Sequence, residues 1–79
     1  MDVLIVDSNK KDAEELILML SDWNHSAVHA ADTALAVETA KRSVFEVILI
    51  ELTQNDPDRY RTIPDLKLYN PGASILTMV

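Results

Sequence analysis

The sequence predicts an α/β domain built on a parallel sheet, and three observations lead to this fold class. Residues 3–6 and 47–50 are short runs in which every side chain is aliphatic, as in strands that are buried on both faces of a parallel sheet. Residues 12–23 and 33–42 place apolar residues three and four positions apart, which is the spacing of one helix face. Strand and helix patterns alternate along the chain, as in parallel sheets whose crossover helices cover both faces.

The first strand is predicted at residues 3–6, and the polar triplet Asp7-Ser8-Asn9 follows it. Ser8 or Asn9 is the expected N-cap of the next helix, because both side chains accept hydrogen bonds from free amide groups of a first helical turn. Helical spacing predicts this helix over residues 12–23. Its apolar face consists of Ala13, Leu16, Ile17 and Leu20.

The middle of the chain repeats this order. Residues 25–31 are predicted to form a second strand, and Asp32 is the expected N-cap of a helix over residues 33–42. Residues 44–52 contain a fully aliphatic run, which indicates a strand at the centre of a covered sheet.

The last third begins with a polar loop, expected over residues 53–58. Pro64 has no backbone donor, and proline is tolerated in the first turn of a helix. We therefore expect a short helix that begins near Pro64. Residues 70–72 predict a turn, and residues 73–79 a fourth strand.

Composition excludes several classes of function. The 79 residues allow one domain, and the absence of cysteine excludes disulfides and thiolate metal sites. With 13 acidic against 7 basic residues, the segment is expected to repel nucleic acid. It has neither the run of about 20 apolar residues that spans a bilayer nor the pattern of a signal peptide, so we expect a cytoplasmic protein that is not attached to a membrane.

Several stretches resemble the receiver domain of bacterial two-component response regulators. Residues 3–9 are similar to the family's first strand, which ends in acidic residues, and residues 30–40 to its second strand and helix. Residues 46–52 are similar to the third strand, whose last residue but one is normally the phosphorylated aspartate. The resemblance covers the whole chain. It implies a flavodoxin-like parallel sheet with strand order 2-1-3-4 and helices on both faces.

The resemblance also implies where a functional site lies. Asp7 and Glu51 end neighbouring inner strands, so their carboxylates are expected at one end of the sheet, where open α/β sheets bind ligands. Together with Ser8 they form the expected acidic pocket, and Glu51 stands at the phospho-acceptor position. A Mg²⁺ ion would be held there by Asp7 and Glu51.

Two departures from the family pattern weaken this chemistry. Ser8 stands where a typical receiver has its second acid, so one carboxylate ligand of Mg²⁺ is reduced to a hydroxyl and Mg²⁺ binding is expected to weaken. Glu51 is one methylene longer than aspartate, and in-line phosphoryl transfer depends on the position of the attacking oxygen. We therefore expect no certain cofactor and a poor phosphoryl acceptor, although a glutamate can stand in for the charge of a phosphorylated aspartate.

The resemblance places the strand-four switch residue, normally Thr or Ser, at Val79, with Thr77 two residues earlier on the same strand face. It also implies a fourth helix, a fifth strand and a fifth helix that these residues do not supply. Without them we expect apolar surface on the first and third strands to face water, and the fourth strand to be an open edge. The chain is thus expected to form a homo-oligomer or to be part of a longer chain.

The leading functional hypothesis is a signalling module that binds a protein partner, either a histidine kinase or a downstream signalling protein, without aspartyl phosphorylation and without enzymatic activity. The first alternative is an active phosphoryl-accepting receiver. The second is a small flavodoxin-like domain that binds a ligand such as a nucleotide or cobalamin. Gly72 is the only glycine, which argues against the second alternative because phosphate-binding loops depend on glycine.

Overall fold

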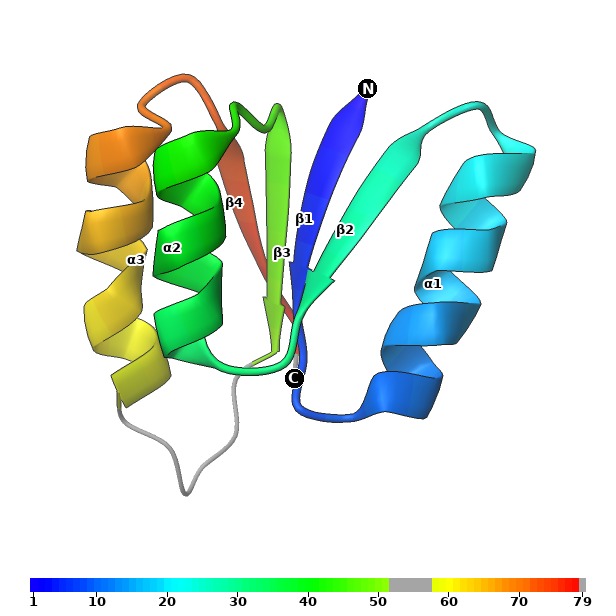
Figure 1. Ribbon diagram of the computed structural model, residues 1–79, viewed down its shortest axis with the longest axis horizontal. Helices are drawn as coiled ribbons and strands as arrows, with labels where there is room; N and C mark the ends of the chain where they lie inside the picture. The colour runs from blue at the N-terminus through cyan, green and yellow to red at the C-terminus, as the bar shows by residue number, and fades with distance from the viewer. Residues whose placement is uncertain (52–57, 79) are drawn as a thin grey trace.

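The described residues form a four-stranded parallel sheet with helices on both faces. The computed structural model describes residues 1–51 and 58–78, with side chains for 1–51 and 61–78. The elements in chain order are β1 (Asp2–Val6), α1 (Lys10–Asp22), β2 (Ser26–Ala30), α2 (Thr33–Arg42), β3 (Val47–Glu51), α3 (Asp58–Tyr69) and β4 (Ser74–Met78). The strands lie in the order β2-β1-β3-β4 and all neighbours are parallel. Figure 1 shows α1 on one side of the sheet and the adjacent pair α2 and α3 on the other. The predicted fold class and strand order are confirmed.

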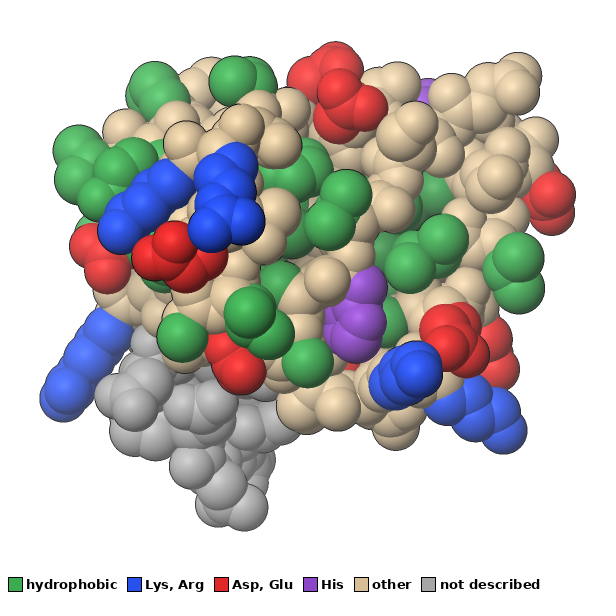
Figure 2. Space-filling model, in the orientation of Figure 1, with side chains coloured by type: hydrophobic (Ala, Val, Ile, Leu, Met, Phe, Trp, Pro, Cys, Tyr) green, Lys and Arg blue, Asp and Glu red, His purple; other side chains and the backbone are tan. Residues whose placement is uncertain are grey.

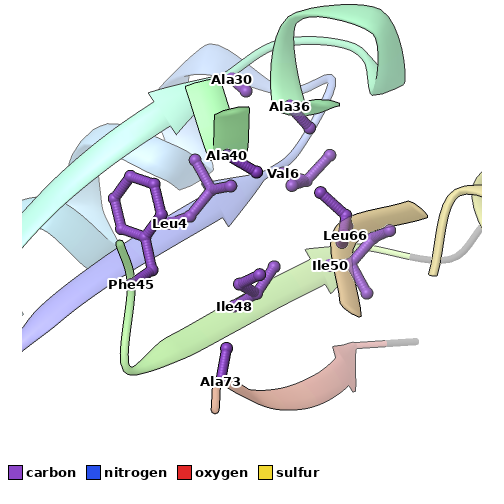
Figure 3. Close-up of a cluster of buried hydrophobic side chains, with 10 residues drawn as sticks. All are labelled: Leu4, Val6, Ala30, Ala36, Ala40, Phe45, Ile48, Ile50, Leu66 and Ala73. Carbon is purple, nitrogen blue, oxygen red and sulfur yellow. The ribbon is translucent and has the colours of Figure 1, made fainter. Parts of the chain in front are cut away.

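The larger half of the core lies between the sheet and the pair α2 and α3. Side chains alternate along a strand, so every second residue of β1 and β3 faces these helices. The alanines of α2 are small enough to let the helix approach the sheet closely. The buried cluster consists of Leu4, Val6, Ala30, Ala36, Ala40, Phe45, Ile48, Ile50, Leu66 and Ala73 (Figure 3).

The other face of the sheet is covered by α1. Val3 and Ile5 of β1 are 2% and 0% exposed and pack against Ala13. The expectation that this face of the first strand meets water is therefore wrong, because α1 alone is wide enough to cover β1. The rest of the α1 packing face is the predicted one: Leu16, Ile17 and Leu20.

Coverage of this face ends beyond β1. On β3, Val47 and Leu49 are only partly buried. Leu76 of β4 lies beside Leu49 in the parallel register and is 53% exposed. An apolar strip over β3 and β4 thus faces water next to α1, and β4 is an edge strand. This part of the prediction is confirmed.

The ends of α1 follow known capping chemistry. Asn9 is the N-cap, and its side chain accepts a hydrogen bond from the backbone N–H of Asp12 at 3.1 Å. At the other end, Asn24 adopts a left-handed conformation with φ of 63°. The N–H groups of Asn24 and His25 then bond to the carbonyl groups of residues 21 and 20, which is the arrangement of a Schellman motif.

The helix of the last third is longer than expected. It begins at Asp58, and Pro64 lies inside it, so the prediction of a short helix that begins near Pro64 is wrong. The physical reason is packing: Thr62 and Leu66, one turn apart, are 7% and 0% exposed, whereas Pro64 is exposed on another side. The buried face continues past the proline and outweighs its missing backbone donor.

A buried asparagine, Asn70, is hydrogen-bonded to the backbone at the end of α2 and in the segment before β3. Asn70 is 1% exposed, and its side-chain oxygen accepts the backbone N–H of Phe45 at 2.6 Å. Its side-chain nitrogen donates to the carbonyl groups of Ala40 at 2.9 Å and Ser43 at 3.3 Å. One side chain thereby fixes the end of α2, the segment that leads into β3 and the turn before β4.

Candidate functional site

Asp7 follows β1 directly and is held on several sides. Its side chain is 4% exposed, and one carboxylate oxygen accepts the backbone N–H of Asn9 at 2.8 Å. Its own N–H donates to the carbonyl of Ala30 on β2 at 3.1 Å. These bonds extend the pairing of β1 with β2 by one residue and turn the chain toward the start of α1.

Glu51 is the last residue of β3 and is half-buried. Val6 pairs with Ile50 in the parallel register, so the next residue of each strand, Asp7 and Glu51, lies at the same end of the sheet. The hydroxyl of Ser8 donates to a carboxylate oxygen of Glu51 across 3.5 Å. The structure therefore brings together all three residues that the sequence assigned to an acidic pocket.

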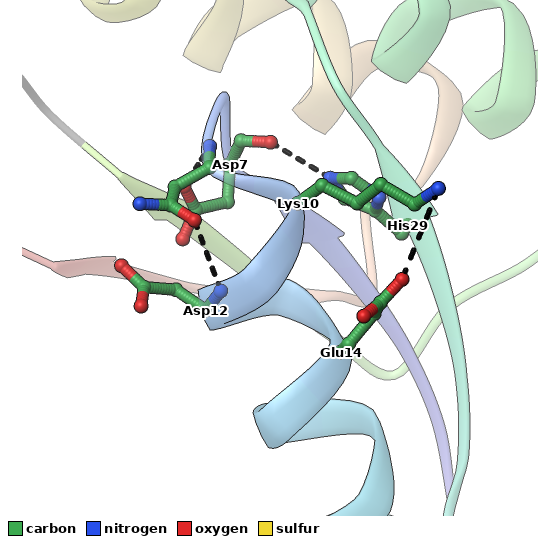
Figure 4. A network of polar contacts seen from close by, with 6 residues as sticks. Asp7, Lys10, Asp12, Glu14 and His29 are labelled. Atoms are coloured by element: carbon green, nitrogen blue, oxygen red, sulfur yellow. Dashed lines mark hydrogen bonds and ion pairs between the residues drawn. The ribbon is translucent and has the colours of Figure 1, made fainter.

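His29 of β2 also belongs to this end of the sheet. Its Nε2 lies 2.7 Å from the backbone carbonyl of Asp7, and because a carbonyl only accepts, the ring nitrogen is the donor. Figure 4 shows the ring reaching from β2 toward the turn after β1. The sequence pattern did not indicate this role, since the contact depends on the register of two strands whose contacting residues lie 22 positions apart.

Thr77, one of the two positions proposed for the strand-four switch, lies near the end of β4. Met78 is the residue of β4 that pairs with Glu51, and Thr77 pairs with Ile50. Because side chains alternate across a strand, Thr77 faces the α2 and α3 layer and Glu51 faces the α1 layer. The register thus gives no support to Thr77 as a partner of Glu51, and Val79 lies outside the described residues.

The acidic pocket has one carboxylate fewer than the receiver pattern, because Ser8 stands in place of the second acid. Mg²⁺ prefers octahedral oxygen ligands, carboxylates among them, and keeps several waters. The three residues of the acidic pocket offer two carboxylates and one hydroxyl, and one oxygen of Asp7 already accepts the N–H of Asn9. Within residues 1–51 and 58–78, no group of three or more His, Cys, Asp or Glu side chains is arranged to hold a metal ion.

A hollow of about 220 Å³ lies at the opposite end of the sheet, where the strands begin. Its walls are Asp2, Ser26, Val28, Ser43, Val44 and Phe45. It is separate from the acidic pocket and contains none of the residues predicted for function.

Comparison with solved structures identifies proteins that have the same fold. A response regulator from Burkholderia pseudomallei, whose crystal structure contains a phosphorylated aspartic acid, a calcium ion and citrate, superposes with a TM-score of 0.89 and 25% identity over 96% of this chain and 45% of that one. The receiver domain of NtrC4 from Aquifex aeolicus gives 0.82 and 22% over 96% of this chain and 63% of its own. The chain has the response-regulator receiver fold.

Other matches agree with a receiver-type domain. The chemotaxis protein CheY4 of Vibrio cholerae superposes with a TM-score of 0.85 and 20% identity, over 96% of this chain and 65% of that one. The transcriptional regulatory protein ZraR of Klebsiella oxytoca, and its counterpart in Escherichia coli K12, are each 26% identical over 78 residues. These residues are 99% of this chain but 18% of the curated relatives. No protein-family model matches the chain.

The structure carries no candidate membrane span. In the described part of the chain, no helix has both the length and the apolar character that a bilayer crossing requires.

Proposed function

We propose that this receiver-type domain acts in signal transduction by binding other proteins, without aspartyl phosphorylation. The proposal rests on Glu51. A glutamate ends β3, and its carboxylate accepts a hydrogen bond from the hydroxyl of Ser8. Its reacting oxygen would sit one methylene beyond that of an aspartate. Since phosphoryl transfer depends on in-line placement of the attacking oxygen, such a carboxylate is a poor acceptor.

The proposal includes a permanent charge at the acceptor position. Glu51 places a negative group at the end of β3 whether or not a phosphodonor is present. A receiver whose acceptor cannot be switched would present one constant surface to its partner. The role is therefore one of binding and not of catalysis, and the partner is a histidine kinase or a downstream signalling protein.

Exposed apolar side chains on α1 offer a surface for such a partner. Leu18, Met19 and Trp23 are 66%, 55% and 69% exposed near the end of this helix. Large apolar and aromatic side chains are common anchors in protein interfaces. On the side of the molecule seen in Figure 2, acidic and basic side chains lie interspersed, so the net negative charge is not gathered there.

The alternative is an active phosphoryl-accepting receiver. It is favoured by the Burkholderia pseudomallei regulator, which carries a phosphorylated aspartic acid on the same fold. In this chain the acceptor would be Glu51 or a nearby aspartate.

Intact-mass spectrometry separates the two functions. The protein is incubated with a small phosphodonor and Mg²⁺, and we expect no gain of a phosphoryl group. The receiver domain of the Burkholderia pseudomallei regulator serves as the positive control for the donor. A gain of one phosphoryl group that hydroxylamine removes would identify an acyl phosphate and establish the alternative. The variant with both Ser8→Asp and Glu51→Asp tests whether these two positions account for the difference, because it restores the family pattern.

The proposal extends to the oligomeric state of the chain and its location in the cell. The apolar strip over β3 and β4 is a surface that a second copy, or further residues of a longer chain, would cover. A homo-oligomer is the form proposed for the chain by itself, and the cytoplasm is the location that the sequence predicts.

A further inference from the structure

We propose that the hydroxyl of Ser8 takes the place of a divalent cation at the carboxyl end of the sheet, so that this site is complete without metal. The inference goes beyond the proposed function. It concerns what holds the strand ends together, and it stands whether or not Glu51 accepts a phosphoryl group.

Electrostatic repulsion disfavours an acid at position 8 in the absence of a cation. The register of β1 and β3 brings the carboxylates of Asp7 and Glu51 to one end of the sheet. An acid at position 8 would add a third negative group within hydrogen-bond range of Glu51, and like charges so close repel unless a cation lies between them. Ser8 instead donates its hydroxyl to Glu51 at 3.5 Å. A repulsive contact that needs an ion is thereby replaced by an attractive one that does not.

Asp7 already makes hydrogen bonds to other groups of the protein. One of its carboxylate oxygens accepts the N–H of Asn9 at 2.8 Å, and its backbone carbonyl accepts a hydrogen bond from His29 at 2.7 Å. The side chain is 4% exposed. The turn after β1 is fixed by these bonds and does not depend on an ion.

The test measures Mg²⁺ dependence without any phosphodonor. Thermal melts and amide NMR spectra are recorded in MgCl₂ and in NaCl of equal ionic strength. For the natural sequence we expect the same melting temperature in both salts and no saturable shift of the Asp7, Ser8 and Glu51 amides. For Ser8→Asp we expect a lower melting temperature in NaCl that MgCl₂ restores, because an ion that binds only the folded state stabilises it.

The matched control is Ser74→Asp, which adds the same charge at the first residue of β4, at the other end of the sheet. We expect its melting temperature to respond equally to the two salts. Ser8→Asp should bind Mg²⁺ at least about tenfold more tightly than the natural sequence, since changes even to the outer partners of a metal site alter affinity by about 10–100-fold.

Two results would overturn the inference. One is a saturable Mg²⁺ shift at Asp7 and Glu51 in the natural sequence, which requires no variant to fold. The other is a Ser8→Asp protein whose stability is no more Mg²⁺-dependent than that of Ser74→Asp. Phosphoryl gain by the natural sequence would instead defeat the proposed function, so the two failures are distinguishable.

Discussion

Asn70 is the polar side chain on which the packing of three chain segments depends. It is fully enclosed, and each of its side-chain hydrogen bonds goes to a backbone group of another segment. The N–H of Phe45 and the carbonyl of Ala40 are buried and cannot turn to water when their partner is removed. The cost of losing the side chain is therefore set by the groups left behind.

Asn70→Ala is expected to lower the free energy of unfolding by about 2–4 kcal/mol, because each buried polar group left without a partner costs roughly 1–3 kcal/mol. Urea unfolding followed by circular dichroism measures the change. Asn9→Ala is the control, since it removes one exposed capping bond worth about 1 kcal/mol. Equal losses in the two variants would contradict the role assigned to Asn70.

Asn70→Asp gives a test with a pH sign. The carboxylate keeps an acceptor for the N–H of Phe45 but points negative oxygen at the carbonyls of Ala40 and Ser43, to which the amide donates. Burial beside acceptors raises the pKa of such a group in the folded state above its unfolded value. The variant's deficit relative to the natural sequence is therefore full above the folded pKa and shrinks as pH falls through it. Urea unfolding at pH 7 and pH 5 measures this, and a deficit that grows on acidification would contradict it.

Single residues divide into those that sequence predicts and those that it does not. The meeting of Asp7 and Glu51 could be predicted, because parallel neighbours carry their carboxyl ends to the same edge. The contacts of Asn70 with Phe45 and of His29 with Asp7 could not. They join residues 25 and 22 positions apart and depend on a register and on side-chain directions that no local pattern contains.

At the scale of elements, α3 is the helix in which local preference and packing disagree. Proline inside a helix removes one backbone hydrogen bond and crowds the preceding turn. Sequence reasoning therefore placed the start of the helix near Pro64. It could not weigh the buried contacts of Thr62 and Leu66, which exist only once the helix lies on the sheet.

Pro64→Ala is expected to stabilise the protein. Alanine is favoured over proline by about 3 kcal/mol inside a helix. Without proline the unfolded chain gains conformational entropy, which lowers the free energy of unfolding by roughly 0.4–1 kcal/mol. A net gain of about 2–2.6 kcal/mol in the free energy of unfolding should appear in urea melts, with more helical signal in circular dichroism. Pro71→Ala, in the turn before β4, should give no gain, and an equal gain there would argue against a strained helix.

The whole molecule is closed on one face of its sheet and open on part of the other. Coverage by α2 and α3 follows from the alternation of strands and helices, whereas the strand order was implied by the resemblance to receiver domains. The extent of coverage by α1 could not be read from the sequence, because it depends on where the helix lies across the strands. The open strip along β3 and β4 is what remains.

Leu76→Lys tests whether this strip joins two copies. The natural sequence is expected to show a light-scattering mass above that of one chain at micromolar concentration, since exposed apolar strips next to an open strand edge favour association. A lysine at this position, half exposed beside Leu49, should reduce the mass to one chain. Leu68→Lys is the control on α3, where the leucine is 71% exposed in the other layer, and should leave the mass unchanged. A natural protein with the mass of one chain would make the oligomer proposal wrong.

Met1 is hydrogen-bonded to the start of the neighbouring strand β2. The carbonyl of Met1 accepts the N–H of Ser26 at 3.0 Å, and that of Asp2 accepts the N–H of Glu46 at 2.9 Å. Strand β1 then runs for five residues before it reaches Asp7, a rise of about 17 Å. A fluorophore or affinity label joined ahead of Met1 would thus emerge beside the starts of the strands, and could report on or immobilise the protein while leaving Ser8 and Glu51 unobstructed.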